Sequence, residues 1–258
     1  MLLLLLINSC GTLRNGHIWG DDVNYLPGWE KIRDAAYDAA TAPEVWIPLS
    51  GALVVHVTNT DHDISSWAIK RTPIFGSQKN AAAFSDHLLY FSQVAYISSA
   101  LMAPGGDDFG DWIYAKLKGF SVGTLTYFSN KALTDYIKIE TGRLRPDESN
   151  HKSFPSGHTS KSAVYYMLTT RNIETIPYFA ENKTPIHIGF TVLTTATAWS
   201  RIEANRHYPT DVLAGAALGN FIGAFINDAF IGIEHSHNLD FHLSSYENSY
   251  MLNFIIKL

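Results

Sequence analysis

The sequence reads KIETGRLRP at residues 138–146, PSGH at 155–158 and SRIEANRHYPTD at 200–211. These three clusters combine cationic side chains, two imidazoles, a carboxylate and a Ser-Gly turn. Such a set suits a tetrahedral oxyanion with a nucleophile and a proton donor beside it, because fixed cations and backbone N–H groups neutralise phosphoryl oxygens. The clusters therefore indicate phosphoryl chemistry at a histidine nucleophile, provided that the fold brings them together.

The second cluster combines an anion-binding turn with an acid. Gly157 lets the backbone approach an anion, and the N–H groups of Ser156 and Gly157 would face it from a helix N-terminus, where the dipole favours negative charge. His158 follows directly and could give a proton to a leaving oxygen. A plain helix cap, in which Ser156 accepts from the N–H of Thr159, explains the same residues.

The third cluster supplies a candidate nucleophile. His207 and Asp211 are four residues apart, the spacing of two side chains on one helix face. A carboxylate on one ring nitrogen would fix the tautomer and leave the other nitrogen free to attack phosphorus. A structural His–Asp pair around Pro209 is the alternative interpretation.

The cations of the first and third clusters complete the candidate site. Arg145 and Arg201 can each hold two phosphoryl oxygens, and Lys138 adds a point charge. Each of them alone fits a solvated surface charge equally well. Arg143 and Arg206 do not fit this pattern, and we assign them to the surface or to pairing with neighbours.

Taken together, the order and spacing of the three clusters resemble the type 2 phosphatidic-acid phosphatase superfamily, which also holds bacterial class A acid phosphatases and vanadium haloperoxidases. The resemblance covers residues 45–232 and is sharpest from Lys138 to Gly215. It implies an all-α fold, a helical bundle of the acid phosphatase/vanadium haloperoxidase type, with the site at the ends of its helices.

The resemblance also implies a role for each matched residue. His207 would form a phosphohistidine, Asp211 would orient it, and His158 would protonate the leaving group and then activate water. No metal or other cofactor is expected, although vanadate would bind as a phosphate mimic. The phosphoryl oxygens would be held by Lys138, Arg145, Ser156, Gly157 and Arg201.

Composition limits the class of protein and its partners. The chain has 258 residues, of which 46% are hydrophobic and 17% charged, enough for one sizeable core. A net charge of -5 without a basic run argues against nucleic acid as a partner. We expect a phosphorylated lipid, or else a small phosphate ester, as substrate; the oligomeric state stays open.

The N-terminus indicates export. Residues 1–10 form a short apolar run that ends at Cys10 and resembles a bacterial lipoprotein signal, so Cys10 is a candidate for lipidation. This predicts an extracytoplasmic protein, in the periplasm or tethered to a membrane that faces it. The mean hydropathy of -0.03 favours a soluble helical body on that anchor.

The remaining chain divides by composition. We expect an exposed linker at 11–25, a helical phosphatase domain at 26–232 and a tail at 233–258 that forms a β-hairpin. Gly215, Gly219 and Gly223, spaced four apart, predict tight helix–helix contact. The expected helices span residues 29–40, 43–57, 61–70, 81–102, 112–139, 159–168, 187–204 and 211–226.

Three other functions fit parts of this pattern: a non-specific soluble acid phosphatase, a vanadium-dependent haloperoxidase, and a non-catalytic protein that binds phosphate or lipid head groups. A protein that only binds phosphate does not need a proton donor such as His158 beside the anion, so the two histidines favour an enzyme.

Overall fold

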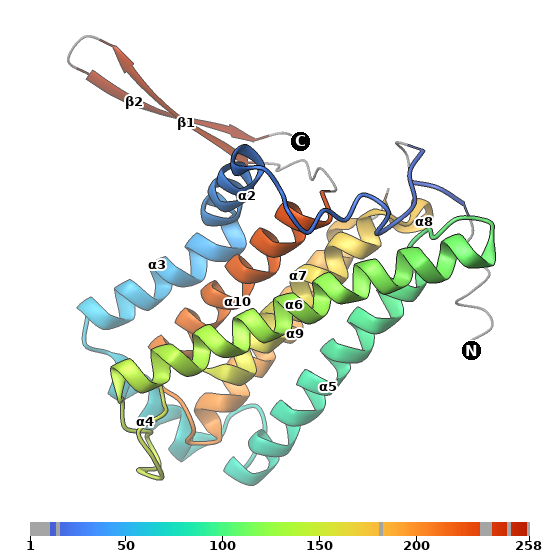
Figure 1. Cartoon of the computed structure of the whole chain (residues 1–258). Coiled ribbons are helices and arrows are strands. Elements are labelled where there is room, and N and C mark those ends of the chain that lie inside the picture. The colour runs from blue at the N-terminus through green and yellow to red at the C-terminus, as the bar shows by residue number, and fades with distance from the viewer. Residues whose placement is uncertain (1–10, 14–15, 181–182, 233–238, 247–248, 257–258) are drawn as a thin grey trace.

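The computed structural model describes residues 11–13, 16–180, 183–232, 239–246 and 249–256 of the chain, so Cys10 lies outside the described residues. Helices make up most of this structure (Figure 1). Their bounds are α2 Trp29–Thr41, α3 Pro43–Val57, α4 Asp61–Arg71, α5 Gln78–Met102, α6 Phe109–Thr141, α7 Gly157–Glu174, α8 Pro177–Ala180, α9 Lys183–Glu203 and α10 Pro209–Phe230. The expected helical bundle is confirmed.

Local sequence explains where several helices begin and end. Pro43 and Pro209 occupy the first turns of α3 and α10, where a missing N–H costs nothing. Ser77 caps α5 by accepting from the N–H of Asn80. Gly142 adopts a left-handed conformation, with φ of 51°, and ends α6 before Arg145, as the following proline requires.

Helices α7 and α10 form the centre of the bundle, and the glycines of α10 allow their close approach. A Cβ at Gly215 would lie 2.6 Å from the Ser156 carbonyl oxygen, and one at Gly223 would lie 2.8 Å from Met167 Cβ. At Gly219 the added atom would collide with the Ser160 carbonyl oxygen. The four-residue spacing of these glycines therefore reflects tight contact between α10 and α7, as the sequence predicted.

The segment expected to be an exposed linker at 11–25 is in part core. Trp19 is 1% exposed and packs among Tyr96, Ala100 and Leu168. Its indole nitrogen donates to Asn172 Oδ1 at 3.0 Å. The prediction of a linker was wrong here because one large aromatic ring outweighs the polar residues around it.

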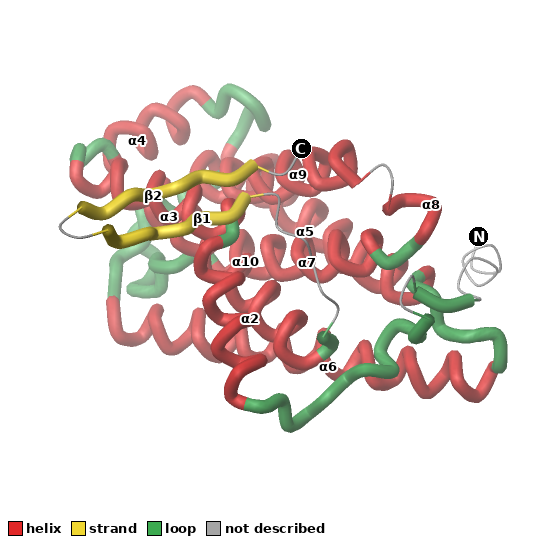
Figure 2. The backbone as a smooth tube through the Cα atoms, turned by 90° about the horizontal axis from the view of Figure 1, so that it is seen from above, coloured by secondary structure: helices red, strands yellow, loops and turns green. Residues whose placement is uncertain are grey.

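The C-terminal tail contains the expected hairpin. Strands β1 (Leu239–Tyr246) and β2 (Ser249–Ile256) pair antiparallel, from Leu239 opposite Ile256 to Tyr246 opposite Ser249. Figure 2 shows the two strands side by side.

The described helices carry both buried and exposed apolar surface. Of these helices, α10 is long and apolar enough to cross a membrane, with 61% of its apolar stretch buried inside the protein; α2 and α3, bent by 52°, would form a second span if taken as one. Large apolar side chains that are more than half exposed occur on α3, α5, α6 and α9, for example Leu53, Val57, Phe91, Phe128, Ile139, Ile188 and Val192.

Candidate active site

The three sequence clusters meet at one end of the bundle. The last turn of α6 carries Lys138, the first residues of α7 include His158, the last turn of α9 carries Arg201, and His207 lies just before α10. Figure 1 places the end of α6 and the start of α10 at the end of the bundle where α4 lies. Four helical termini therefore surround the site, and α5 adds Ser85 and Asp86 from its third turn.

His207 is held by a backbone carbonyl. Its ring is 1% exposed, and Nδ1 lies 2.7 Å from the carbonyl oxygen of Ser153. The nearest oxygen of Asp211 is 3.7 Å from the same nitrogen, too far for a hydrogen bond. Because a carbonyl only accepts, Nδ1 carries the proton and Nε2 keeps its lone pair.

This arrangement corrects the expected direct bond between Asp211 and the imidazole. Asp211 acts on His207 through its charge and through Ser153, whose hydroxyl donates to Asp211 Oδ2 at 2.5 Å. Burial lowers the pKa of His207 to about 4, against the opposing effect of Asp211, and the charges of Arg201 and Lys138 add to the decrease. The ring is therefore neutral through the mildly acidic range.

Asp211 is fully buried and stays ionised. Burial raises the pKa of this carboxyl, but the nearby His207 ring, the charge of Arg143, the Ser153 hydroxyl and the Tyr208 N–H outweigh it, so the net pKa lies below the usual 3.8. The Tyr208 N–H donates to Asp211 Oδ2 at 2.8 Å, and Arg143 Nη1 donates to Oδ1 at 2.8 Å.

Arg143 is part of this site, although the sequence only placed it at the surface or in a pair. Its Nη1 also donates to Thr210 Oγ1 at 2.6 Å, and its Nη2 donates to Asp61 Oδ2 at 2.5 Å. Asp61 in turn accepts from the backbone N–H of Thr210 at 2.9 Å. The guanidinium therefore lies between two carboxylates, one from α4 and one from α10.

Lys138 is turned toward the loop before α7. Its ammonium donates to the carbonyl oxygens of Lys152, at 3.1 Å, and of Pro155. An ammonium has three donors, so one remains for a ligand. Burial, followed by the charge of Arg145, lowers the pKa of Lys138 to about 8.

The two arginines have unused donors. Arg201 is 7% exposed; Nη1 donates to Ser85 Oγ at 2.8 Å, and no acceptor for its buried Nε is found among the described residues. Burial, then the neighbouring Arg145 charge, lowers the pKa of Arg201 to about 10. Arg145 is fixed through Nε, which donates to Asn150 Oδ1 at 3.0 Å. A buried donor without an acceptor, surrounded by cations, favours an anion as ligand.

The start of α7 contributes less than expected. The N–H of Ser156 donates to the Asp211 carbonyl oxygen at 2.8 Å, so it cannot hold a ligand. The Ser156 hydroxyl caps the helix by accepting from the N–H of Thr159 at 3.5 Å. Gly157 is the first residue of α7, where backbone N–H groups lack helical partners and are available to a ligand. A Cβ on Gly157 would lie 3.9 Å from Lys138 Cε, so the turn is close to this cation.

His158 has a partner that the sequence did not reveal. Its Nε2 lies 2.8 Å from Asp86 Oδ1 on α5. Burial and the charge of Arg201 lower the pKa of His158, and the hydrogen bond and charge of Asp86 oppose this. When the ring is protonated, the N–H on Nε2 donates to Asp86, and the N–H on Nδ1 remains as a proton source.

The geometry thus joins a neutral imidazole, a second imidazole that can carry a proton, and a set of cations with free donors. Within the described residues, no group of three or more His, Cys, Asp or Glu side chains is placed to hold a metal ion.

Known proteins resemble this chain over the stretch that contains Lys138, His158, Arg201 and His207. Residues 119–230 match the family model of the PAP2 superfamily. A lipid A 1-phosphatase of Porphyromonas gingivalis is 40% identical over 86 residues, which are 33% of this chain and 18% of that protein. A phosphatidylglycerophosphatase B of Bacillus subtilis strain 168 is 28% identical over 116 residues, which are 43% of this chain and 57% of that protein. The matches thus span less than two thirds of either relative.

A solved structure shares the fold. The crystal structure of a transmembrane PAP2 type phosphatidylglycerolphosphate phosphatase from Bacillus subtilis superimposes with a TM-score of 0.55 at 22% identity, covering 74% of this chain and 94% of that one. This likeness confirms the helical fold class.

Proposed function

From the match of residues 119–230 to the PAP2 superfamily, we propose that the chain is a member of this superfamily and a metal-independent phosphatase that acts on lipid phosphates through a phosphohistidine. The observation that carries the proposal is the pairing of His207 with Ser153, because it leaves the Nε2 lone pair of a neutral ring near Arg201, whose buried Nε has no acceptor among the described residues.

In the first step, the Nε2 lone pair of His207 attacks phosphorus, and the bond from phosphorus to the ester oxygen breaks. The proton of the His158 imidazolium passes to that oxygen as it leaves. The ring of His207 becomes a phosphorylated cation, which the Ser153 carbonyl and the Asp211 carboxylate stabilise. Lys138, Arg145 and Arg201 would neutralise the phosphoryl oxygens.

In the second step, the neutral His158 takes a proton from water as the water oxygen bonds to phosphorus. The bond between phosphorus and His207 breaks, and the electron pair returns to Nε2. Inorganic phosphate leaves, and both rings recover their starting states. No redox partner is needed.

A lipid substrate and membrane association are supported by two observations. Relatives that match this chain are named as phosphatases of lipid A and of phosphatidylglycerophosphate. Exposed apolar side chains on α3, α5, α6 and α9 give the protein a surface suited to lipid contact. We propose an extracytoplasmic location, with Cys10 as the site of an anchoring lipid.

Simple assays distinguish the three alternative functions from this one. A soluble acid phosphatase would not prefer a lipid, and a binding protein would retain phosphate without turnover. In a haloperoxidase, vanadate bound at His207 would support halide oxidation by peroxide, whereas here vanadate is expected only to inhibit.

The test is a hydrolysis panel with EDTA present: phosphatidate, diacylglycerol pyrophosphate, a polyprenyl diphosphate and a soluble aryl phosphate. We expect turnover of the lipid substrates at higher kcat/KM than the aryl phosphate, unchanged by EDTA. Loss of activity to EDTA would contradict the metal-free mechanism, and binding of phosphate without any turnover would support the non-catalytic alternative.

The pH profile gives a separate prediction through Asp86. His207 must be neutral, with a pKa of about 4, and His158 must be protonated, with a pKa below its ordinary 6.5, so we expect an acidic optimum. Asp86→Asn removes the carboxylate that raises the pKa of His158. Less of the acid is then protonated at a given pH, so the alkaline limb of kcat/KM should move to lower pH.

An alkyl phosphate, which has a poor leaving group, should show this shift, and an aryl phosphate should show it weakly. Asp34→Asn, which removes a similarly exposed carboxylate on α2, is the control. An alkaline limb that stays in place in Asp86→Asn would exclude His158 as the acid.

A further inference from the structure

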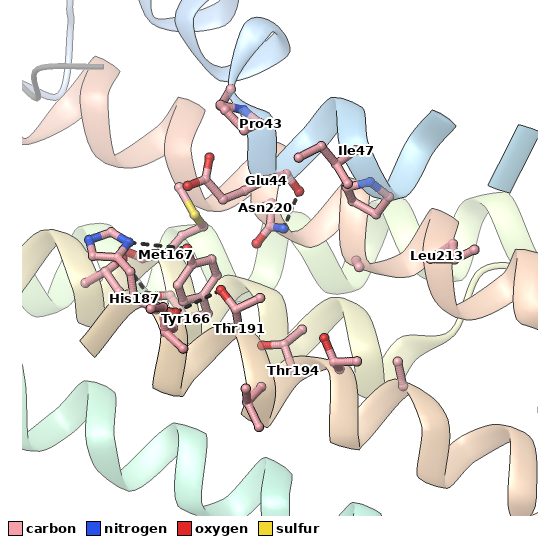
Figure 3. A pocket seen from close by; sticks show the side chains of 18 of the residues that line it. Pro43, Glu44, Ile47, Tyr166, Met167, His187, Thr191, Thr194, Leu213 and Asn220 are labelled. Atoms are coloured by element: carbon pink, nitrogen blue, oxygen red, sulfur yellow. Dashed lines mark hydrogen bonds between the residues drawn. The ribbon is translucent and has the colours of Figure 1, made fainter. Parts of the chain in front are cut away.

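A groove of about 800 Å³ runs between α3 and α9, with α7 and α10 as its floor (Figure 3). That volume lies within the range of small-molecule sites. Among the described residues, its lining includes neither the two histidines nor the cations of the active site. The groove is therefore separate from the active-site residues.

The groove is long and mainly apolar. Along α9 its lining extends from Lys183 to Ala198, which corresponds to about 22 Å of helix. Its apolar lining includes Ile47 of α3 and Leu213 of α10, together with Val192 of α9. A shape of this kind suits one extended hydrocarbon chain.

One end of the groove contains an unsatisfied acceptor. Asn220 is 5% exposed, and its Nδ2 donates to the Glu44 carbonyl oxygen at 2.6 Å. Within the described part of the chain, no donor reaches Asn220 Oδ1. Figure 3 shows this oxygen turned away from Glu44 and into the groove. A buried acceptor without a donor costs free energy, which a ligand hydroxyl or ammonium would recover.

The other polar groups at this end favour the same head group. The carboxylates of Glu44 and Glu174 both line the groove, and His187 Nε2 lies 2.9 Å from Glu174 Oε1. Two carboxylates disfavour an anionic head. Of the cations here, Arg171 has its charge paired through Nη2 with Asp228 at 2.7 Å, although its Nε has no acceptor among the described residues, and Lys183 lies at the first residue of α9.

We propose that this groove binds an amphiphile whose single hydrocarbon chain lies along α9 and whose hydroxyl or ammonium head donates to Asn220. The inference does not rest on the phosphatase function. The dephosphorylated lipid is one source of such a hydroxyl, and a lipid amine is another.

The experiment is photolabelling of the purified full chain with dodecyl probes that carry a mid-chain diazirine and end in a hydroxyl, an ammonium or a phosphate. Adducts are located by peptide mass spectrometry. We expect hydroxyl or ammonium probes to label the α3 and α9 groove peptides at least about tenfold more than the phosphate probe, and monolaurin to compete with the hydroxyl probe. Competition by dodecylamine but not by monolaurin would identify an amine as the ligand.

Two exposed valines make a matched pair of variants. Val192→Trp places a bulky ring in the groove and should reduce groove labelling at least about tenfold. Val57→Trp alters a valine of similar exposure, 68% against 62%, that does not line the groove, and should leave labelling within about twofold. Asn220→Leu should remove the preference for donor heads.

The proposal is overturned if the two tryptophan variants behave alike, because labelling then follows exposed apolar surface in general. It is also overturned if the phosphate probe labels the groove as well as the hydroxyl probe does. Because the readout is an adduct at named peptides, a failure of the phosphatase assay does not affect it.

Discussion

His207→Ala is expected to abolish hydrolysis of phosphate esters, with a loss of kcat of about 10⁴-fold or more, because nucleophile removal eliminates the covalent path. The surrounding cations would still bind the phosphoryl group, so the Kd for vanadate should rise far less than kcat falls. The measurement is kcat on an aryl phosphate, together with trapping of the enzyme labelled from a ³²P-substrate. A phosphohistidine label should be acid-labile and stable to alkali.

The control for this variant is His56→Ala, which removes an exposed imidazole of α3 that belongs to none of the three sequence clusters. It should keep full activity and full labelling. Residual turnover in His207→Ala within about tenfold of wild type would show that water attacks phosphorus directly, and the phosphohistidine would have to be abandoned.

Much of the fold follows from short-range signals. Proline at positions 43 and 209, and a glycine at 142, fix helix ends by their own backbone restrictions, so they act whatever surrounds them. Gly215 and Gly219 indicate close helix packing because only a missing side chain allows it. These features were predictable because each depends on one residue and its nearest turn.

For the active site, the sequence predicted which residues take part but not how they are hydrogen-bonded. The sequence placed His207, Asp211 and the cations in one site, but it could not show that the partner of Nδ1 is the carbonyl of Ser153, 54 residues away. Every residue has a backbone carbonyl, so the residue type at position 153 does not indicate that this carbonyl accepts from His207. In the same way, Ser156 suits an anion turn by composition, and yet its N–H donates to the Asp211 carbonyl.

Carboxylates distant in sequence were also missed. Asp86 reaches His158 across 72 residues, and Asp61 reaches Thr210 across 149. Asp61 was expected only as the first residue of a helix, which it is. Its second role depends on where α4 packs, and no local pattern contains that information.

Arg143→Gln is the second variant with a large expected effect. The guanidinium lies between the carboxylates of Asp61 and Asp211, which are 8% and 0% exposed. Glutamine leaves both carboxylates buried without a cation, so we expect the free energy of unfolding to fall by up to about 3 kcal/mol. Because Asp211 then loses its fixed orientation, kcat should fall about 10–100-fold with little change in KM.

Comparison with Arg206→Gln isolates this effect. Arg206 pairs with Asp147 at 2.7 Å on a more exposed surface, so its removal should cost less than about 1 kcal/mol and leave kcat nearly unchanged. Arg143→Lys keeps the charge but lacks the planar fork that reaches two carboxylates, so it should recover only part of the activity. Equal losses of kcat in Arg143→Gln and Arg206→Gln would mean that Arg143 does not position Asp211.

The pH dependence of stability gives Arg143→Gln a readout independent of activity. The pKa of Asp211 is below 3.8 in the folded protein, so its ionised form stabilises the fold above that pH, and this stability is lost as pH falls through the folded pKa. Without Arg143 the folded pKa lies closer to the unfolded one, so acid unfolding should begin at a higher pH than in the wild type. Adding Asp61→Asn to Arg143→Gln removes one of the two uncompensated charges and should restore part of the unfolding free energy at neutral pH. If the double variant is no more stable than the single one, the two carboxylates are not coupled through the guanidinium, and Asp211 is held by Ser153 and Tyr208 alone.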